Sequence, residues 1–203
     1  MTLRFIFTLA LLNTTSVRAG RVMMALYALH LGAQPVTVGL VAATFSAFPM
    51  VMSWSVGRIS DRYGPRWLLL GGALGGAVGL LVPFWYPTLP AVFVAAALNG
   101  LSFTFYNVSL QTQVGLQSPP ERRAANFGTL SLFLALASFF GPLMAGLSID
   151  GLGHARACLL LALFTFLPVG MVVLRGHRVP RAGRARVEQD RKSTRLNSSH
   201  GYI

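Results

Sequence analysis

The sequence predicts an all-α membrane protein built of six transmembrane helices. Three observations lead to this fold class. Hydrophobic residues make up 54% of the 203-residue chain and charged residues only 11%, against about 25% in a typical soluble domain. The apolar stretches reach the roughly 20 residues that a helix needs to cross a bilayer. The charges and turn-forming residues fall in the short segments between these stretches. A soluble helical protein with a large buried core fits this pattern poorly.

The first three spans are predicted at residues 3–31, 36–56 and 67–86. The beginning of the first span also fits a signal peptide. However, no small-residue cleavage site leads into a soluble chain, and five more spans follow, so a first transmembrane helix is favoured. A Gly-Ala-Gln-Pro turn separates the first two spans. The third span carries glycines at every fourth position, which predicts a face for close helix packing.

The last three spans are predicted at residues 90–114, 127–147 and 155–174. The breaks before them are Tyr-Pro-Thr-Leu-Pro, Ser-Pro-Pro-Glu and Gly-Leu-Gly, all turn-forming sequences. The sixth span contains the single cysteine, Cys158, which excludes an internal disulfide and is interpreted as a small core residue.

Basic residues are distributed unevenly between the two ends of the predicted helices. The gaps on one side hold only Arg156. Positively charged segments remain in the cytoplasm, so both termini are expected there, in a bacterial cytoplasmic membrane. The residues on the cytoplasmic side are Arg4, Arg58, Arg62, Arg66, Arg122, Arg123 and eight residues from Arg175 onward.

A weak internal repeat supports the arrangement of six spans. Gly57-x3-Asp61-x2-Gly64 follows the second span, and Gly146-x3-Asp150-x2-Gly153 follows the fifth with identical spacing. Because each copy would contain three crossings, the second copy is inverted relative to the first. The sequence therefore predicts two inverted three-helix repeats.

The segment between the second and third spans carries a glycine, acid and arginine motif. It resembles the signature loop of the major facilitator superfamily of transporters, although Pro65 stands where a basic residue is usual. The resemblance implies a loop that holds the two halves of a transporter together and steers their conformational exchange. An ordinary solvated loop is the alternative. The matching residues are Gly57, Asp61, Arg62, Gly64 and Arg66.

The fifth span provides a second match. Gly128, Gly141, Pro142 and Gly146 follow the spacing of a glycine-rich motif of the same superfamily, with alanines at two of its glycine positions. In that family the motif is often associated with exporters. The alternative is generic packing, since small residues let membrane helices approach closely.

Thr14, Arg18 and Arg21 lie on one side of the first span, because spacings of four and three residues share a helical face. Each arginine at the centre of a membrane costs about 2.5–3.5 kcal/mol on insertion scales. We hypothesise that this face lines a transport cavity and attracts anionic groups, as the resemblance implies for the first and fourth helices. Snorkelling to an interface and pairing with a missing second half of the transporter are the alternatives.

The fourth span carries a polar stripe that a lipid-facing helix would not need. The stripe either lines the cavity or makes hydrogen bonds between helices. Ala96 stands four residues before Gly100, where proton-coupled members often have an arginine. The stripe comprises Asn99, Ser102, Tyr106, Ser109 and Gln113.

Three regions are expected along the chain. Residues 1–174 form the six-helix bundle, and residues 175–189 resemble a basic cytoplasmic connector. Residues 190–203 resemble translated sequencing-adapter sequence and are excluded from fold reasoning as a non-native tail. The chain is therefore expected to be the N-terminal half of a transporter whose C-terminal half is missing.

The expected function is secondary active transport of a small solute by alternating access. Expected partners are the lipid bilayer, a small-molecule substrate with anionic character, a coupling ion or proton, and the missing half. Nucleic acid is not expected, because the basic residues form no continuous face. Cofactors, metals and enzyme activity are not expected either; Asp150 and His154 alone make a poor metal site. A self-contained six-helix protein with a structural or assembly role is the alternative.

Overall fold

A computed structural model describes residues 3–63 and 65–175 and confirms the predicted all-α fold. The expected basic connector from residue 176 onward and the expected non-native tail lie outside the described residues. The helices are α1 (Leu3–His30), α2 (Pro35–Tyr63), α3 (Pro65–Trp85), α4 (Leu89–Gln117), the short 3₁₀ helix η1 (Pro120–Arg122), α5 (Arg123–Leu152) and α6 (His154–Arg175).

Several helices are longer than the apolar pattern predicts. The expected turn at residues 57–66 is wrong in its extent, because α2 continues through this segment to Tyr63 and α3 begins at Pro65. A helix of 29 residues is about 44 Å long, whereas the hydrocarbon core measures about 30 Å. The polar end of α2 therefore continues the helix beyond the apolar layer, where hydropathy no longer marks it.

Two glycines end helices at one end of the bundle. Gly32 and Gly153 have φ angles of +80° and +76°, a region that residues with a Cβ rarely adopt. The Gly153 N–H donates to the Ile149 carbonyl at 2.8 Å and so closes the last turn of α5. The predicted breaks after the first and fifth spans are thus confirmed.

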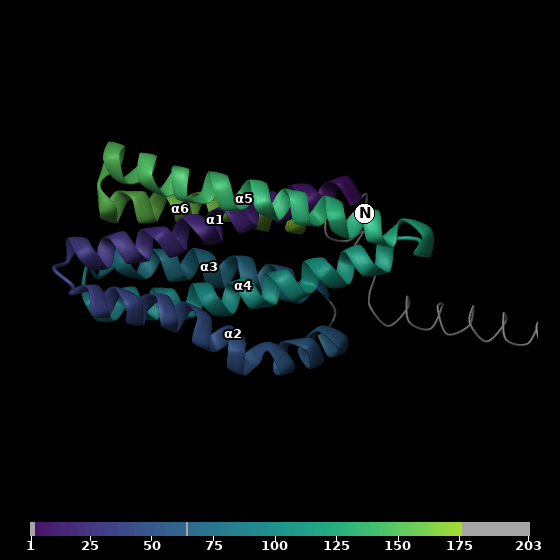
Figure 1. Ribbon diagram of the computed structural model, residues 1–203, viewed down its shortest axis with the longest axis horizontal. Helices are drawn as coiled ribbons and strands as arrows, with labels where there is room; N and C mark the ends of the chain where they lie inside the picture. Colours follow the sequence, from purple (N-terminus) through teal and green to yellow (C-terminus); the bar gives the residue numbers. More distant parts are fainter. Residues whose placement is uncertain (1–2, 64, 176–203) are drawn as a thin grey trace, which may run out of the picture.

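The long helices run back and forth along the longest axis of the molecule (Figure 1). The N-terminus and the α2–α3 and α4–α5 connections lie at one end, and the other three connections lie at the opposite end. Among the described residues, the basic residues that the sequence assigns to one side therefore belong to helix ends that share one end of the bundle: Arg4, Arg58, Arg62, Arg66, Arg122, Arg123 and Arg175.

The helix pairs follow the predicted repeat. Exchanging α1, α2 and α3 with α4, α5 and α6 turns the α1–α5 pair into the α4–α2 pair, and both pairs pack closely. Two apolar surface cavities follow the same relation. One of about 350 Å³ lies between α5, α6 and α1, and one of about 230 Å³ lies between α2, α3 and α4.

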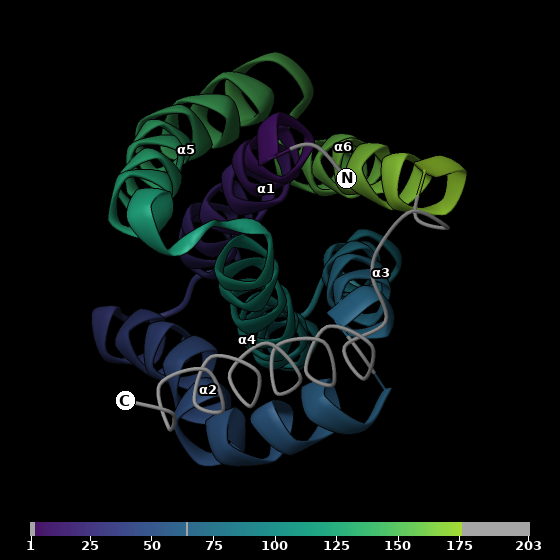
Figure 2. The same cartoon turned by 90° about the vertical axis from the view of Figure 1, so that its right-hand side faces the viewer.

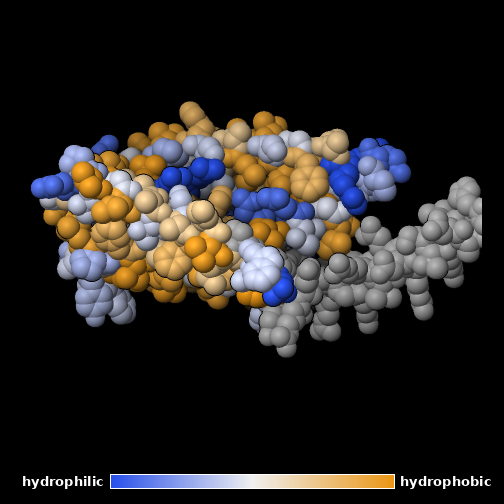
Figure 3. Space-filling model, turned by 60° about the horizontal axis from the view of Figure 1, so that its bottom comes forward, coloured by the Kyte–Doolittle hydropathy of each residue, from blue (hydrophilic) through white to orange (hydrophobic). Residues whose placement is uncertain are grey.

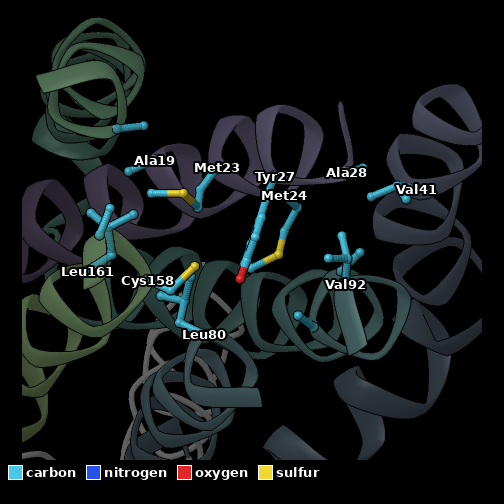
Figure 4. Packing of buried hydrophobic residues seen from close by; sticks show 14 of the residues in the cluster. Ala19, Met23, Met24, Tyr27, Ala28, Val41, Leu80, Val92, Cys158 and Leu161 are labelled. Carbon is cyan, nitrogen blue, oxygen red and sulfur yellow. The ribbon is translucent and has the colours of Figure 1, made fainter. Parts of the chain in front are cut away.

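Helix α1 supplies the centre of the main core (Figure 4). Met23 and Tyr27 of α1 pack with Leu80 of α3 and with Cys158 and Leu161 of α6. Cys158 is fully buried, as expected for a small core residue. The Tyr27 hydroxyl donates to the Pro83 carbonyl at 3.3 Å, which ties α1 to α3.

Five of the described helices are long and apolar enough to cross a membrane, and α1 is the exception. Its middle turns contain Asn13, Thr14, Thr15, Ser16, Arg18 and Arg21. These residues lower its hydropathy, yet α1 contacts every other long helix of the described bundle. Figure 3 shows a mainly hydrophobic surface with hydrophilic groups at the ends and midway along the molecule.

Candidate functional site

One side of the bundle is bounded by α2 and α5, with α1 and α4 between them, while α3 and α6 lie on the other side (Figure 2). Four residues from three helices meet on the first side. We call them the cationic face: Arg18 and Arg21 of α1, Phe45 of α2 and Phe103 of α4.

Arg18 is partly buried at the junction of α1, α4 and α5. Its guanidinium carbon lies 5.9 Å from the centre of the Phe103 ring. On the α5 side it packs against Gly141, where an added Cβ would lie 2.5 Å from the Arg18 Cβ and 3.0 Å from the Ala19 nitrogen. The Arg18 Nε is buried and has no hydrogen-bond partner among the described residues. A charged donor without a partner is costly in the interior.

Arg21 lies one helical turn further along α1 and is exposed. Its guanidinium carbon lies 5.2 Å from the centre of the Phe45 ring on α2. Both arginines therefore rest on aromatic rings, which attract cations through the negative face of the ring.

Acidic residues are absent from the middle of the described helices. The full chain has five Asp and Glu residues. Those among the described residues are Asp61 near the end of α2, Glu121 in η1 and Asp150 in the last turn of α5. Arg18 and Arg21 lie midway along α1, so the described helices offer them aromatic rings and no carboxylate at that depth.

The polar stripe of α4 lies in the contacts between helices within the bundle. All five stripe residues are buried, and Thr14 of α1 is buried as well. The seam with α3 is tight: an added Cβ on Gly75 would lie 2.7 Å from the Ser102 hydroxyl, and one on Gly79 would lie 2.8 Å from the Asn99 amide nitrogen.

One residue of this stripe makes a hydrogen bond to another helix. The Tyr106 hydroxyl donates to the Leu9 carbonyl of α1 at 3.2 Å. The Asn99 amide and the Ser109 hydroxyl instead donate to carbonyls one turn earlier in α4. Within this bundle, the stripe thus contacts α1 and α3.

Sequence reasoning missed the neighbours of the two arginines. Phe45 and Phe103 gave no signal, because phenylalanine is common in any membrane helix. Asn107 and Gln111 continue the Phe103 side of α4 at four-residue spacing, and the Gln111 amide donates to the Asn107 carbonyl oxygen at 2.7 Å. The four-residue spacing of these two polar residues was the signal that could have identified Asn107 and Gln111 as part of the same side of α4.

The residues of the superfamily-like loop motif lie at one end of the bundle. Gly57, Asp61 and Arg62 belong to the last turns of α2, Arg66 belongs to the first turn of α3, and Gly64 lies outside the described residues. Beside the motif, the Arg58 guanidinium carbon lies 3.9 Å from the centre of the Trp54 ring.

The glycine-rich motif divides into one tight position and several open ones. Gly141 approaches α1 closely, whereas added Cβ atoms at Gly128 and Gly146 would meet nothing within 4 Å. Pro142 is exposed. Gly141 is therefore the motif glycine that brings α5 against Arg18.

The structure shows no group of three or more potential metal ligands among the described residues. His154 stacks on His30, with ring centres 4.1 Å apart, at the end of the bundle away from the N-terminus. Tyr27 stacks on His154 at 5.6 Å. This ring cluster joins the end of α1 to the beginning of α6.

The sequence of this chain is similar to a known protein family and to several of its members. The sequence profile of the Major Facilitator Superfamily matches residues 6–199. The Staphylopine export protein of Staphylococcus aureus is 29% identical over 145 residues, which cover 71% of this chain and 34% of that protein. The Major facilitator superfamily multidrug transporter mfsB of Aspergillus fumigatus is 32% identical over 103 residues, covering 51% of this chain and 17% of that protein.

Solved structures agree at the level of the fold. A peptide transporter POT in complex with sulfate superposes with a TM-score of 0.74 at 19% identity, covering 97% of this chain and 44% of that one. A POT family transporter in complex with 5-aminolevulinic acid gives a TM-score of 0.77 at 20% identity, covering 87% of this chain and 38% of that one. The chain thus spans less than half of the proteins that it resembles.

Proposed function

The chain belongs to the major facilitator superfamily, and we propose that it is the N-terminal half of a secondary transporter that moves a small solute by alternating access. It corresponds to roughly the N-terminal half of its homologues. In this mechanism two bundles rock against each other around a site near the middle of the membrane. The side bounded by α2 and α5 is the side that we assign to the second bundle and the solute.

The cationic face is the observation that supports an anionic or carboxylate-bearing solute. Two arginines remain midway along α1 although each carries an insertion cost of about 2.5–3.5 kcal/mol. A solute carboxylate can accept hydrogen bonds from a guanidinium in a bidentate arrangement. It would also give the buried Arg18 Nε the partner that it lacks among the described residues.

The loop motif and the orientation complete the proposal. We assign the ends of α2 and α3 to the contact that controls conformational exchange between the two halves. The basic helix ends face the cytoplasm of a bacterial cell, with both termini on that side. A coupling ion or proton would supply the energy. The name of the Staphylopine export protein, one of the relatives described above, refers to export, so the transport assay measures movement in both directions.

Transport by the full-length gene product in proteoliposomes tests this function. We expect a panel of labelled solutes to show preference for anions over neutral and cationic compounds. Arg18→Ala should weaken the apparent affinity roughly tenfold or more, since a hydrogen bond to a charged group contributes about 1.5–3 kcal/mol.

Arg156→Ala is the matched control, because Arg156 is exposed at the opposite end of the described bundle from Arg58. It should leave the affinity unchanged. An Arg18→Ala protein that inserts normally and transports anions with unaltered affinity would contradict the assignment of the anion to this face.

A further inference from the structure

The two arginines of the cationic face are connected through a pair of aromatic rings. Arg21 rests on Phe45 and Arg18 rests on Phe103. The two rings contact each other in a tilted arrangement, with centres 6.3 Å apart. Phe45 is largely buried. The cations on α1 are therefore supported by one ring from α2 and one from α4.

The backbone of α2 also contacts α4 at Phe45. An added Cβ on Gly100 would collide with the carbonyl group of Phe45, so only a glycine permits this crossing. Proline has no N–H, and Pro49 follows Phe45 by four residues. The usual helical hydrogen bond to the Phe45 carbonyl therefore cannot form.

This carbonyl lies where α2 changes direction. Proline inside a helix is a common cause of a bend, and α2 bends near its middle (Figure 1). A carbonyl released by the proline thus points at Gly100 of α4, while the side chain of the same residue supports Arg21. Phe45 therefore lies at the bend of α2, contacts α4 where the two helices cross, and places its ring beside Arg21.

We propose that Phe45 and Phe103 are positioning residues for Arg21 and Arg18, and that the contact between Phe45 and Gly100 couples this arrangement to the bend of α2. The proposal rests on the proposed function, because it concerns the arginines assigned to the anion. The two rings hold the guanidinium groups at the cationic face and leave their positive charge unpaired with any carboxylate of the described helices. Long basic side chains otherwise extend toward the membrane interface. A shift of α2 would withdraw the ring from Arg21 and change how that arginine meets the solute.

The guanidinium resonances of Arg18 and Arg21 test the positioning directly. The whole chain is labelled with ¹⁵N-arginine in lipid nanodiscs, and the Nε–Hε signals are assigned with Arg18→Lys and Arg21→Lys. We expect Phe45→Leu to move the Arg21 signal toward the position of Arg156, which is also exposed but lies over no aromatic ring of the described residues. Phe45→Tyr, which keeps the ring, should retain the original signal.

Phe7→Leu is the matched control. Phe7 is 7% exposed, as is Phe45, and it also contacts another phenylalanine, Phe133, but no arginine of the described residues lies over its ring. It should leave the Arg21 signal in place. An Arg21 signal that is unchanged in Phe45→Leu, or that moves equally in Phe45→Tyr, would overturn the proposal.

The coupling to α2 has its own variant. Gly100→Ala should push α2 away from α4 and move the Arg21 signal in the same direction as Phe45→Leu does. If this variant folds and the Arg21 signal stays in place, the coupling is refuted. If it does not fold, Pro49→Ala decides: restoring the N–H should draw the Phe45 carbonyl back into α2 and shift the Arg21 signal, whereas an unmoved signal refutes the coupling.

Sulfate titration of the same samples separates this proposal from the proposed function. We expect sulfate binding to weaken about two- to fivefold in Phe45→Leu, as for the loss of one cation–π contact, and to recover in Phe45→Tyr. If the unmodified chain binds sulfate and Phe45→Leu binds it equally well, the positioning role is refuted. If the unmodified chain binds no sulfate, that result counts against the anion site, while the resonance comparison still decides whether the rings position the arginines.

Discussion

At the scale of single residues, Gly141 decides how closely α5 approaches α1. The absence of a side chain lets α5 lie against the base of Arg18 and the backbone of Thr15 and Ala19. This contact occupies one side of Arg18 and leaves its guanidinium beside Phe103. Gly141 thereby shapes the cationic face through its contact with Arg18.

Gly141→Ala should destabilise the bundle. Its Cβ would lie 2.5 Å from the Arg18 Cβ and 3.0 Å from a backbone nitrogen, and such overpacking costs about 1–3 kcal/mol. Thermal unfolding in detergent should show a lower midpoint, whereas Gly146→Ala, with open space around it, should unfold close to the unmodified chain. Equal midpoints for the two variants would contradict the packing described for Gly141.

The sequence was sufficient to single out the two arginines, but it did not identify the residues that surround them. A charge inside an apolar stretch is visible in any sequence, so Arg18 and Arg21 could be singled out with their shared helical face. Their partners Phe45 and Phe103 come from other helices, and this pairing depends on how α2 and α4 cross. Helical spacing likewise showed that the stripe of α4 shares one side, but it could not show that this side packs on α3.

At the scale of helices, the seam between α3 and α4 is packed through several glycines. An added Cβ on Gly72 would lie 2.9 Å from the Ser102 carbonyl oxygen and 3.1 Å from the Tyr106 nitrogen. Both are backbone atoms, which cannot move aside as the tip of a side chain can. Gly72, Gly75 and Gly79 of α3, at spacings of three and four residues, thus place α4, and with it Phe103, relative to α1.

Gly72→Ala is expected to separate α3 from α4 and to lower stability by about 1–3 kcal/mol. Gly71→Ala is the matched neighbour, because an added Cβ there meets nothing within 4 Å. Unfolding of both variants in the same detergent gives the comparison. A Gly72→Ala chain as stable as Gly71→Ala would show that the seam tolerates an added methyl group.

The number of long helices could be predicted because the apolar stretches are long enough to span a membrane and the breaks between them carry turn-forming residues. The C-terminal end of α2 could not be predicted, because residues 57–63 remain helical after the apolar pattern stops. Nothing in hydropathy distinguishes a polar helical turn from a polar loop. Helix α1 shows the opposite case, since its polar middle lowers its hydropathy although it is the central helix of the described bundle.

At the scale of the whole molecule, alternating helices bring the basic segments to one end (Figure 1). The repeat pairs α1 with α5 as it pairs α4 with α2, which leaves α1 and α4 between α2 and α5 on one side. This side carries two cations and no mid-helix carboxylate among the described residues. We therefore assign this side to a solute and a second bundle, and the opposite side to lipid.

Reporter fusions test the proposed orientation in the membrane. Fusions after Arg123 and after Arg175 should be active as cytoplasmic reporters, whereas fusions near Gln34 and Gly153 should report the outer side, because positively charged segments stay in the cytoplasm. Opposite sides for the fusions after Arg123 and Arg175 would be incompatible with the described bundle.

Thiol accessibility in the full-length protein tests the central claim that the face between α2 and α5 lines the solute path. Single cysteines are placed at Arg21, Gln111 and Leu163 in a Cys158→Ala background, and a charged thiol reagent is applied to membranes. Thiolates react where water reaches them. We predict that Arg21→Cys and Gln111→Cys react and that Leu163→Cys, on the exposed side of α6, does not. Equal lack of reaction at all three positions would contradict the account.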